Sequence, residues 1–165
     1  MISLSDPLPA VNPRGVVLFE GPSKLDGQPI VAIATLSTKN GKTGPMVQTW
    51  VMRADMPPVQ ALHCGASDSV CGDCPLQGTL RNVSFGSHPL GPIGETTRRV
   101  GNACYVRVEQ APRGIWHAWQ AGRYPRFDPD QHFGLFAGRF VRIGSYGEPM
   151  AVPIGPRVVL RTERN

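Results

Sequence analysis

GVVLFEG (residues 15–21), PIVAIATL (residues 29–36) and MVQTWVM (residues 46–52) are the three apolar segments that decide the fold. Each is rich in β-branched or aromatic residues, which is typical of strands. One polar turn with an Asp-Gly pair and another with an Asn-Gly pair separate them, and such pairs favour tight reversals of the chain. We therefore expect three strands in an antiparallel meander.

Beyond residue 52 the pattern changes to short helices. Residues 57–62 predict a helix that starts with two prolines and is capped by Asp55. Residues 111–124 predict a longer helix with Ile115, Trp116 and Trp119 on one face. Residues 129–137, preceded by a capping Asp128, predict a third.

The remaining segments predict one loop and three short strands. Residues 78–102 are rich in Gly, Ser and Pro, so we expect a long flexible loop. Residues 104–108 alternate in polarity as a strand does, and the apolar runs at 140–144 and 157–161 predict two more. Residues 1–14 hold three prolines and predict an irregular arm, which leaves a single domain over residues 15–165.

All four cysteines lie in one part of the chain, with the spacing Cys-x6-Cys-x2-Cys-x29-Cys. Two thiolates two residues apart can bind one metal ion, because a tight turn points both sulfurs inward. We expect a four-thiolate metal site, with His63 as an alternative to the first cysteine. Its ligands are Cys64, Cys71, Cys74 and Cys104. The competing interpretation is four separate buried cysteines.

The metal is predicted to be zinc, which suits a closed structural site in a small, turn-rich fold. The alternative is a 4Fe-4S cluster, because Cys74-Pro75 is similar to the Cys-Pro that ends ferredoxin ligand runs. With this site the predicted fold class is α+β: an N-terminal antiparallel sheet with two or three short helices around a cysteine metal site.

Charge is distributed unevenly along the chain. Residues 1–97 have a net charge of −1, whereas residues 98–165 carry eleven arginines and a net charge of +6. Arginine forms forked hydrogen bonds to phosphate, so this half predicts a nucleic-acid-binding surface. The expected contacts are Arg98, Arg99, Arg123 and Arg126. The alternative is an ordinary solvated basic face in an arginine-rich protein.

A second candidate site follows the strand predicted at residues 140–144. The segment Gly144-Ser145-Tyr146-Gly147-Glu148-Pro149 places a hydroxyl, a phenol and a carboxylate at a strand end, where ligands often bind in α/β folds. We expect Ser145, Tyr146 and Glu148 to form a ligand-binding edge. The alternative is that this segment is an ordinary turn. No serine-hydrolase order, phosphate loop or His-Glu-x2-His motif is present.

The chain has no apolar run of the roughly 20 residues that span a bilayer. Its first residues also lack the basic flank and apolar core of a signal peptide. We expect no membrane association and a cytoplasmic location, that of the host cell if a phage encodes the protein. A reducing compartment favours metal ligation over disulfides.

Ten segments resemble uncharacterised proteins of bacteriophages and plasmids. They are Val16–Ser23, Pro29–Thr35, Lys42-Thr43-Gly44, Gln48-Thr49-Trp50, Arg53-Ala54-Asp55, Cys71-Gly72-Asp73-Cys74-Pro75-Leu76, Cys104-Tyr105-Val106, Gln110-Ala111-Pro112, Gln120–Pro125 and Gly144–Pro149. The resemblance covers roughly residues 15–153. It implies a mobile-element origin and a metal site, but no particular reaction.

The resembling proteins continue past this point with a further α/β stretch and a second cysteine cluster. This chain instead ends with residues 154–165. We therefore expect an uncovered strand edge at residues 140–144, which residues 157–161, a protein partner or a second copy of the chain covers.

Three functions fit these observations. The first is a zinc-binding accessory protein of a phage or plasmid that acts on or near nucleic acid. The second is an iron–sulfur enzyme fragment whose site lies around Cys71, Cys74, Cys104 and residues 144–149. The third is a protein–protein interaction module, such as a host-defence inhibitor or an assembly component. The sequence leaves open whether the protein is an enzyme.

Overall fold

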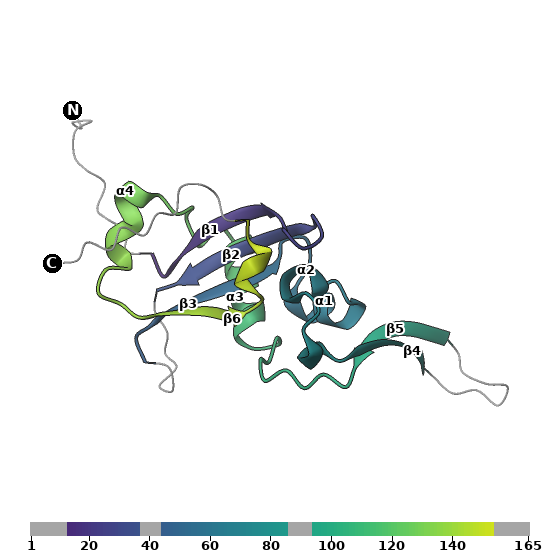
Figure 1. Ribbon diagram of the computed structural model, residues 1–165. Coiled ribbons are helices and arrows are strands. Elements are labelled where there is room, and N and C mark those ends of the chain that lie inside the picture. The colour runs from purple at the N-terminus through teal and green to yellow at the C-terminus, as the bar shows by residue number, and fades with distance from the viewer. Residues whose placement is uncertain (1–12, 37–43, 86–93, 154–165) are drawn as a thin grey trace.

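A computed structural model of the protein describes residues 13–36, 44–85 and 94–153. It shows a mixed α/β fold built on a four-stranded sheet in the order β1-β2-β3-β6 (Figure 1). The strands are β1 (Gly15–Pro22), β2 (Pro29–Thr35), β3 (Val47–Arg53) and β6 (Val141–Tyr146). The first three pair antiparallel, which confirms the predicted meander. Strand β6 pairs parallel to β3, so the complete sheet is mixed.

The core forms around β2 and β3, because their apolar side chains are buried on both faces of the sheet. Ile30, Ile33 and Met52 are fully buried. Helix α3 (Ala111–Gln120) lies behind the sheet in Figure 1. Its residues Ile115, Trp116 and Trp119 pack against this core, as predicted. The Trp116 indole also donates a hydrogen bond to the Arg53 carbonyl at 2.9 Å, which fixes the helix to β3.

A smaller cluster closes the other end of the sheet. There Val16, Ala34, Leu36 and Val47 pack with Phe127, Leu135 and Phe136. The helix expected over residues 129–137 is shorter than predicted: α4 spans Pro129–His132 and continues as the 3-10 turn η2 (Phe133–Leu135). The predicted cap is confirmed, because the Asp128 carboxylate accepts a hydrogen bond from the Asp130 amide.

The prediction of a flexible loop over residues 78–102 is wrong. The chain forms a two-stranded antiparallel hairpin there, with β4 (Thr79–Phe85) and β5 (Gly94–Val100), that extends beyond the sheet (Figure 1). The misleading Gly and Pro residues are concentrated between the two strands, at positions 86–93, outside the described residues. The flanking segments contain Thr, Val and Leu, which suit a pleated ribbon.

The prediction of a strand at residues 104–108 is also wrong. Burial does alternate there, with Tyr105 and Arg107 exposed and Val108 buried. No strand pairs with the segment among the described residues, because its backbone bonds elsewhere: the Cys104 amide donates to the Leu76 carbonyl at 3.0 Å. The strand predicted at 157–161 and the arm at 1–14, apart from residues 13 and 14, lie outside the described residues.

Short helices connect the sheet and the hairpin. They are α1 (Pro58–Cys64), α2 (Asp68–Cys71) and the 3-10 turn η1 (Pro75–Gln77). A further 3-10 turn, η3 (Pro149–Ala151), follows β6. Asp55 does not cap α1 as predicted, because its carboxylate binds the buried Arg53 instead. No helix of the described residues is both long and apolar enough to cross a membrane.

Candidate thiol metal centre

Three of the four cysteines come from segments that the backbone holds together. Cys71 is the last residue of α2, and Cys74 directly precedes η1. Between them Gly72 has a φ of 56°, a left-handed conformation that glycine adopts with little strain, and its amide donates to the Asp68 carbonyl at 2.9 Å. The Leu76 carbonyl then accepts hydrogen bonds from the amides of Ala103 and Cys104, which brings the third cysteine to η1.

The other two thiols influence the ionisation of Cys71. Burial, with smaller contributions from the nearby Cys74 and Cys104 thiols and from Asp68, raises the pKa of the Cys71 thiol to about 12. The three cysteines are half-buried and form no disulfide. A group of neighbouring thiols disfavours its own ionisation, because each new negative charge repels the others. A bound cation reverses this effect, since thiolates are the form that binds metals.

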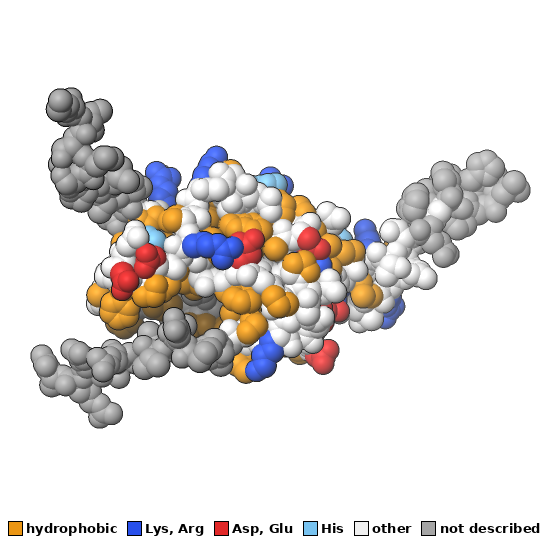
Figure 2. Space-filling model, turned by 90° about the horizontal axis from the view of Figure 1, so that it is seen from above, with side chains coloured by type: hydrophobic (Ala, Val, Ile, Leu, Met, Phe, Trp, Pro, Cys, Tyr) orange, Lys and Arg blue, Asp and Glu red, His pale blue; other side chains and the backbone are white. Residues whose placement is uncertain are grey.

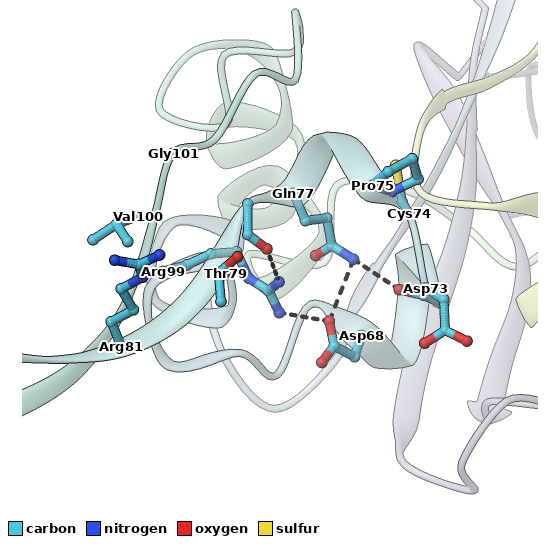
Figure 3. Close-up of a pocket in the computed structure, with 12 residues that line it drawn as sticks. Asp68, Asp73, Cys74, Pro75, Gln77, Thr79, Arg81, Arg99, Val100 and Gly101 are labelled. Carbon is cyan, nitrogen blue, oxygen red and sulfur yellow. Dashed lines mark hydrogen bonds and ion pairs between the residues drawn. The ribbon is translucent and has the colours of Figure 1, made fainter.

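A buried polar network holds the segment around Gly72. Gln77 is buried, and its side-chain amide donates to the Gly72 carbonyl at 2.8 Å and to Asp68 at 3.3 Å (Figure 3). Arg99 of the hairpin forms an ion pair with Asp68 at 2.6 Å and donates to the Gly78 carbonyl at 2.9 Å. The network ties α2, η1 and β5 together and so fixes the turn between two of the cysteines.

The edge predicted at residues 144–149 lies beside these cysteines. The Glu148 amide donates to the carbonyl of Val70, the residue before Cys71, at 2.5 Å. Gly147 packs so closely on β3 that an added Cβ would lie 2.4 Å from the Val51 carbonyl oxygen. The Tyr146 side chain is 5% exposed and shares the core cluster of Val70.

Tyr146 belongs to the core cluster against which Cys71 packs. Its hydroxyl is buried and has no hydrogen-bond partner among the described residues, and the same is true of the Ser145 hydroxyl. Burial raises the pKa of Tyr146 well above its usual value, and the Cys71 and Cys104 thiols raise it further. Glu148 has a different role, because its exposed carboxylate accepts a hydrogen bond from the Met150 amide and caps η3.

The structure does not bring Cys64 and His63 to the other cysteines. Both are exposed at the end of α1 and line a separate shallow hollow against Thr96, Thr97 and Arg98 of the hairpin. The Cys64 thiol donates weak hydrogen bonds to the Met56 sulfur, at 3.9 Å, and to the Ala61 carbonyl oxygen, at 3.8 Å.

No group of three or more His, Cys, Asp or Glu side chains within the described segments is arranged so that it could hold a metal ion as it stands. In a tetrahedral zinc site, Zn–S bonds of about 2.3 Å put the sulfurs less than about 4 Å apart. Binding a single ion here would therefore require the thiols to draw together.

The four arginines predicted to bind nucleic acid lie in different places and have different partners. Arg99 is held by Asp68, and Arg126 forms an ion pair with Glu20 at 3.1 Å. Arg98 and Arg123 are exposed. On the face shown in Figure 2, Lys and Arg side chains are separated by hydrophobic and uncharged surface rather than gathered into one basic area.

The sequence reasoning missed Arg81, which lies directly opposite Arg98 in the hairpin. Arg81 also lines an open hollow of about 730 Å³, shown in Figure 3, together with Asp68, Asp73, Cys74, Gln77 and Arg99. Only the pairing of the two strands brings the two arginines together, and a segment predicted as a loop gives no sign of that pairing.

No protein-family model, curated protein or solved structure matches this chain significantly.

Proposed function

We propose that the protein binds a metal centre through Cys71, Cys74 and Cys104. The observation that supports this most is the position of Cys104, which a 30-residue hairpin excursion returns to the Cys-Gly-Asp-Cys turn. Three half-buried thiols, two from one turn and one from a distant segment, fit the chemistry of a metal site better than that of a plain apolar core.

The leading form of this proposal is a zinc-binding accessory protein of a phage or plasmid that acts on or near nucleic acid. The mobile-element origin rests on the sequence resemblance. The role at nucleic acid is supported by the net charge of +6 over residues 98–165 and by the exposed Arg98 on the hairpin.

A 4Fe-4S cluster is a second candidate, and one observation favours it. The described cysteines are not arranged for a single ion, and only three of them lie together. Each cysteine of a 4Fe-4S cluster binds a different iron atom, so its sulfurs stand farther apart than those around one zinc. Anaerobically purified protein distinguishes the two: a brown protein containing iron and sulfide indicates the cluster, and a colourless one containing zinc indicates the single ion.

The test of the proposal is metal content together with thermal melting, with and without a chelator. Cys74→Ser is expected to release the metal and lower the melting temperature, because metal binding stabilises only the folded chain. The matched control is Cys64→Ser, which removes an exposed thiol and should retain the metal. A protein that binds neither zinc nor iron, and melts unchanged in chelator, would contradict the proposal.

A further inference from the structure

The open hollow of Figure 3 lies where the hairpin meets α2 and η1, and it is lined largely by polar side chains and glycines. Its volume of about 730 Å³ is in the range of small-molecule sites in proteins. The polar side chains that line it are Asp68, Asp73, Gln77, Thr79, Arg81 and Arg99. A hollow of this size and composition suits a charged ligand better than an apolar one.

Arg99 is the buried cation of this hollow. Its side chain is 8% exposed, and its guanidinium is held by the ion pair with Asp68 and by the hydrogen bond to the Gly78 carbonyl. The Nε atom of the same guanidinium has no hydrogen-bond partner among the described residues. Folded proteins rarely bury a polar group without a partner. Arg99 is therefore fixed in place with one hydrogen bond still to be made, and an oxygen atom at the floor of the hollow would supply the acceptor.

Arg81 is the free cation of the hollow. It is exposed and takes part in none of the ion pairs of the described residues. Arg98, directly opposite in the hairpin register, is also exposed and outside these ion pairs. Like charges directly opposite in a sheet repel each other, so an anion beside Arg81 would be stabilised by both. Because Arg98 itself borders the separate hollow at α1, it adds to the positive potential and not to the direct contacts.

The two carboxylates of the hollow leave this positive end uncancelled. Asp68 already accepts hydrogen bonds from Arg99, at 2.6 Å, and from Gln77, at 3.3 Å. Asp73 is exposed and lies at the opposite end of the hollow from Arg81 in Figure 3. A ligand with its anionic group at Arg81 can therefore extend along the hollow and turn hydrogen-bond donors toward Asp73.

We propose that this hollow binds a phosphate monoester. The phosphate lies at Arg81 and at the Thr79 hydroxyl, and one of its oxygens accepts the Nε hydrogen of Arg99. A monoester carries nearly two negative charges at neutral pH, which matches the two unpaired arginines of the hairpin better than the single charge of a phosphodiester does. Two sources supply this chemistry, a free nucleotide and the terminal phosphate of a nucleic-acid strand. The inference deepens the role at nucleic acid proposed above and rests on that part of the proposed function, not on the metal centre.

Isothermal titration calorimetry of the full chain tests the site, with deoxyadenosine monophosphate as the probe and deoxyadenosine as its uncharged counterpart. The nucleotide should bind saturably. Deoxyadenosine should bind at least about tenfold more weakly, because it lacks the charge-assisted hydrogen bonds to arginine. The affinity for the nucleotide should rise between about pH 5 and pH 7, because the phosphate loses its second proton near pH 6 and gains a negative charge.

Three variants locate the binding in the hollow. Arg81→Gln should weaken nucleotide binding about tenfold or more and leave the melting temperature unchanged, because Arg81 is exposed and unpaired. Arg81→Lys keeps the charge but not the forked guanidinium, so it should recover only part of the affinity. Arg123→Gln is the matched control, because it removes the same charge from an exposed arginine outside the hollow, and it should bind the nucleotide as the parent does.

Single-stranded oligonucleotides with and without a terminal phosphate identify the source. Tighter binding of the phosphorylated strand than of both the unphosphorylated strand and the nucleotide would support a strand end. Equally tight binding of the nucleotide and the phosphorylated strand would support a free nucleotide.

The outcomes that overturn the inference are distinct from a failure of the proposed function. Equal affinity for the two strands, with no effect of Arg81→Gln on nucleotide binding, would overturn the monoester site and leave the proposed role at nucleic acid in place. No binding of the nucleotide or of the phosphorylated strand at about 1 mM would overturn the site as well. If the unphosphorylated strand also fails to bind, the role at nucleic acid is overturned with it, whereas the thiol metal centre is unaffected.

Discussion

Arg53 is a buried arginine whose hydrogen bonds connect the sheet to the cysteine-bearing helix. Its guanidinium binds the Asp55 carboxylate through two nitrogens, at 2.9 and 2.7 Å. It also donates to the Ser69 hydroxyl of α2 at 2.9 Å and to Gln28 at 3.2 Å. Because a buried guanidinium without acceptors is strongly destabilising, this network determines where α2 sits on the sheet.

Asp55→Asn tests the charge in this network. The Arg53 hydrogen bond lowers the pKa of Asp55 below 3.8, so its stabilising effect is present above that pH and is lost as the pH falls through the lowered value. An asparagine side chain does not titrate, so its contribution to the stability does not change with pH in this way. We expect the variant to be less stable by about 1–2 kcal/mol at neutral pH, a modest figure because Asp55 is partly exposed.

Urea unfolding from pH 6 down to pH 2 measures this effect. The stability difference between the parent and Asp55→Asn should narrow once the pH falls below about 3.8. Glu109→Gln is the control, because Glu109 is exposed and lies outside the ion pairs of the described residues. If the stability difference between the parent and Asp55→Asn stays constant from pH 6 to pH 2, the carboxylate charge does not hold Arg53.

Gly147→Ala tests the close approach that positions Tyr146. Gly147 and Gly27 share a φ of 75°, but only Gly147 has a neighbour where a Cβ would stand, the Val51 oxygen at 2.4 Å. Gly27→Ala is the matched control and should cost only the left-handed strain of about 1–2 kcal/mol. Gly147→Ala should lower the free energy of unfolding, measured with denaturant, clearly more than Gly27→Ala does. Equal losses would mean that the turn moves away from β3 freely.

At the level of single residues, the sequence predicted that all four cysteines share a site, and the structure brings three of them into neighbouring segments and leaves Cys64 apart. The cysteine spacing predicted a shared site, and the strand-end motif predicted a second one. No local signal showed that Tyr146 would lie beside Cys71, because β6 reaches β3 across nearly ninety residues of intervening chain. Neither did the sequence separate Cys64 from the others, since proximity along the chain does not reveal that α1 ends facing the hairpin.

At the level of elements, the three N-terminal strands were predicted correctly, whereas the hairpin and the pairing of β6 were not. Strands β1 to β3 have strong apolar runs and short turns, so their meander could be expected. The parallel β6 could not, because periodicity identifies a strand without naming its neighbour. Residues 104–108 alternate as expected, yet without a partner strand the alternation only reflects packing against the core.

The hairpin supports a prediction about nucleic acid. Arg81 and Arg98 are exposed and directly opposite, and none of the ion pairs of the described residues involves them. Like charges directly across a sheet destabilise it, and a bound phosphate would relieve that repulsion. Replacing both arginines with glutamine should weaken nucleic-acid binding and reduce the salt dependence of log K by about one for each phosphate that the variant no longer binds.

Fluorescence anisotropy with labelled DNA and RNA over a range of salt concentrations measures this dependence. Arg126→Gln serves as the control, because Arg126 is already paired with Glu20 and should contribute less. Should the parent protein bind neither nucleic acid at about 50 mM salt, the proposed role at nucleic acid would be abandoned in favour of a protein-binding function.

At the scale of the whole molecule, the two edges of the four-stranded sheet differ in how they are covered. On β1, the Val17 amide donates to Pro125 at 2.8 Å and its carbonyl accepts from Phe127 at 2.8 Å, so residues 125–127 cover that edge at Val17. Among the described residues no strand covers the outer edge of β6. There Phe140 is 85% exposed and Ile143 67% exposed. An open edge with apolar side chains is a typical site of association.

We expect this edge to be covered by a second copy of the chain, so that the protein associates as its concentration rises. Light scattering and sedimentation equilibrium measure the mass. Ile143→Lys should shift the protein to the monomer by about tenfold or more in dissociation constant, because it places a charge in an apolar contact. Leu18→Lys, which changes an exposed apolar residue on the covered strand β1, should leave the association unchanged.

The predicted strand at residues 157–161 is the competing cover for this edge, and it lies outside the described residues. If those residues cover the edge, the full chain is monomeric and a variant lacking residues 155–165 associates through the exposed strand. Ile143→Lys should then suppress the association of the shortened chain. A full chain that is monomeric, and stays monomeric and soluble without residues 155–165, would contradict both versions, because an apolar edge that nothing covers should bind its own copies.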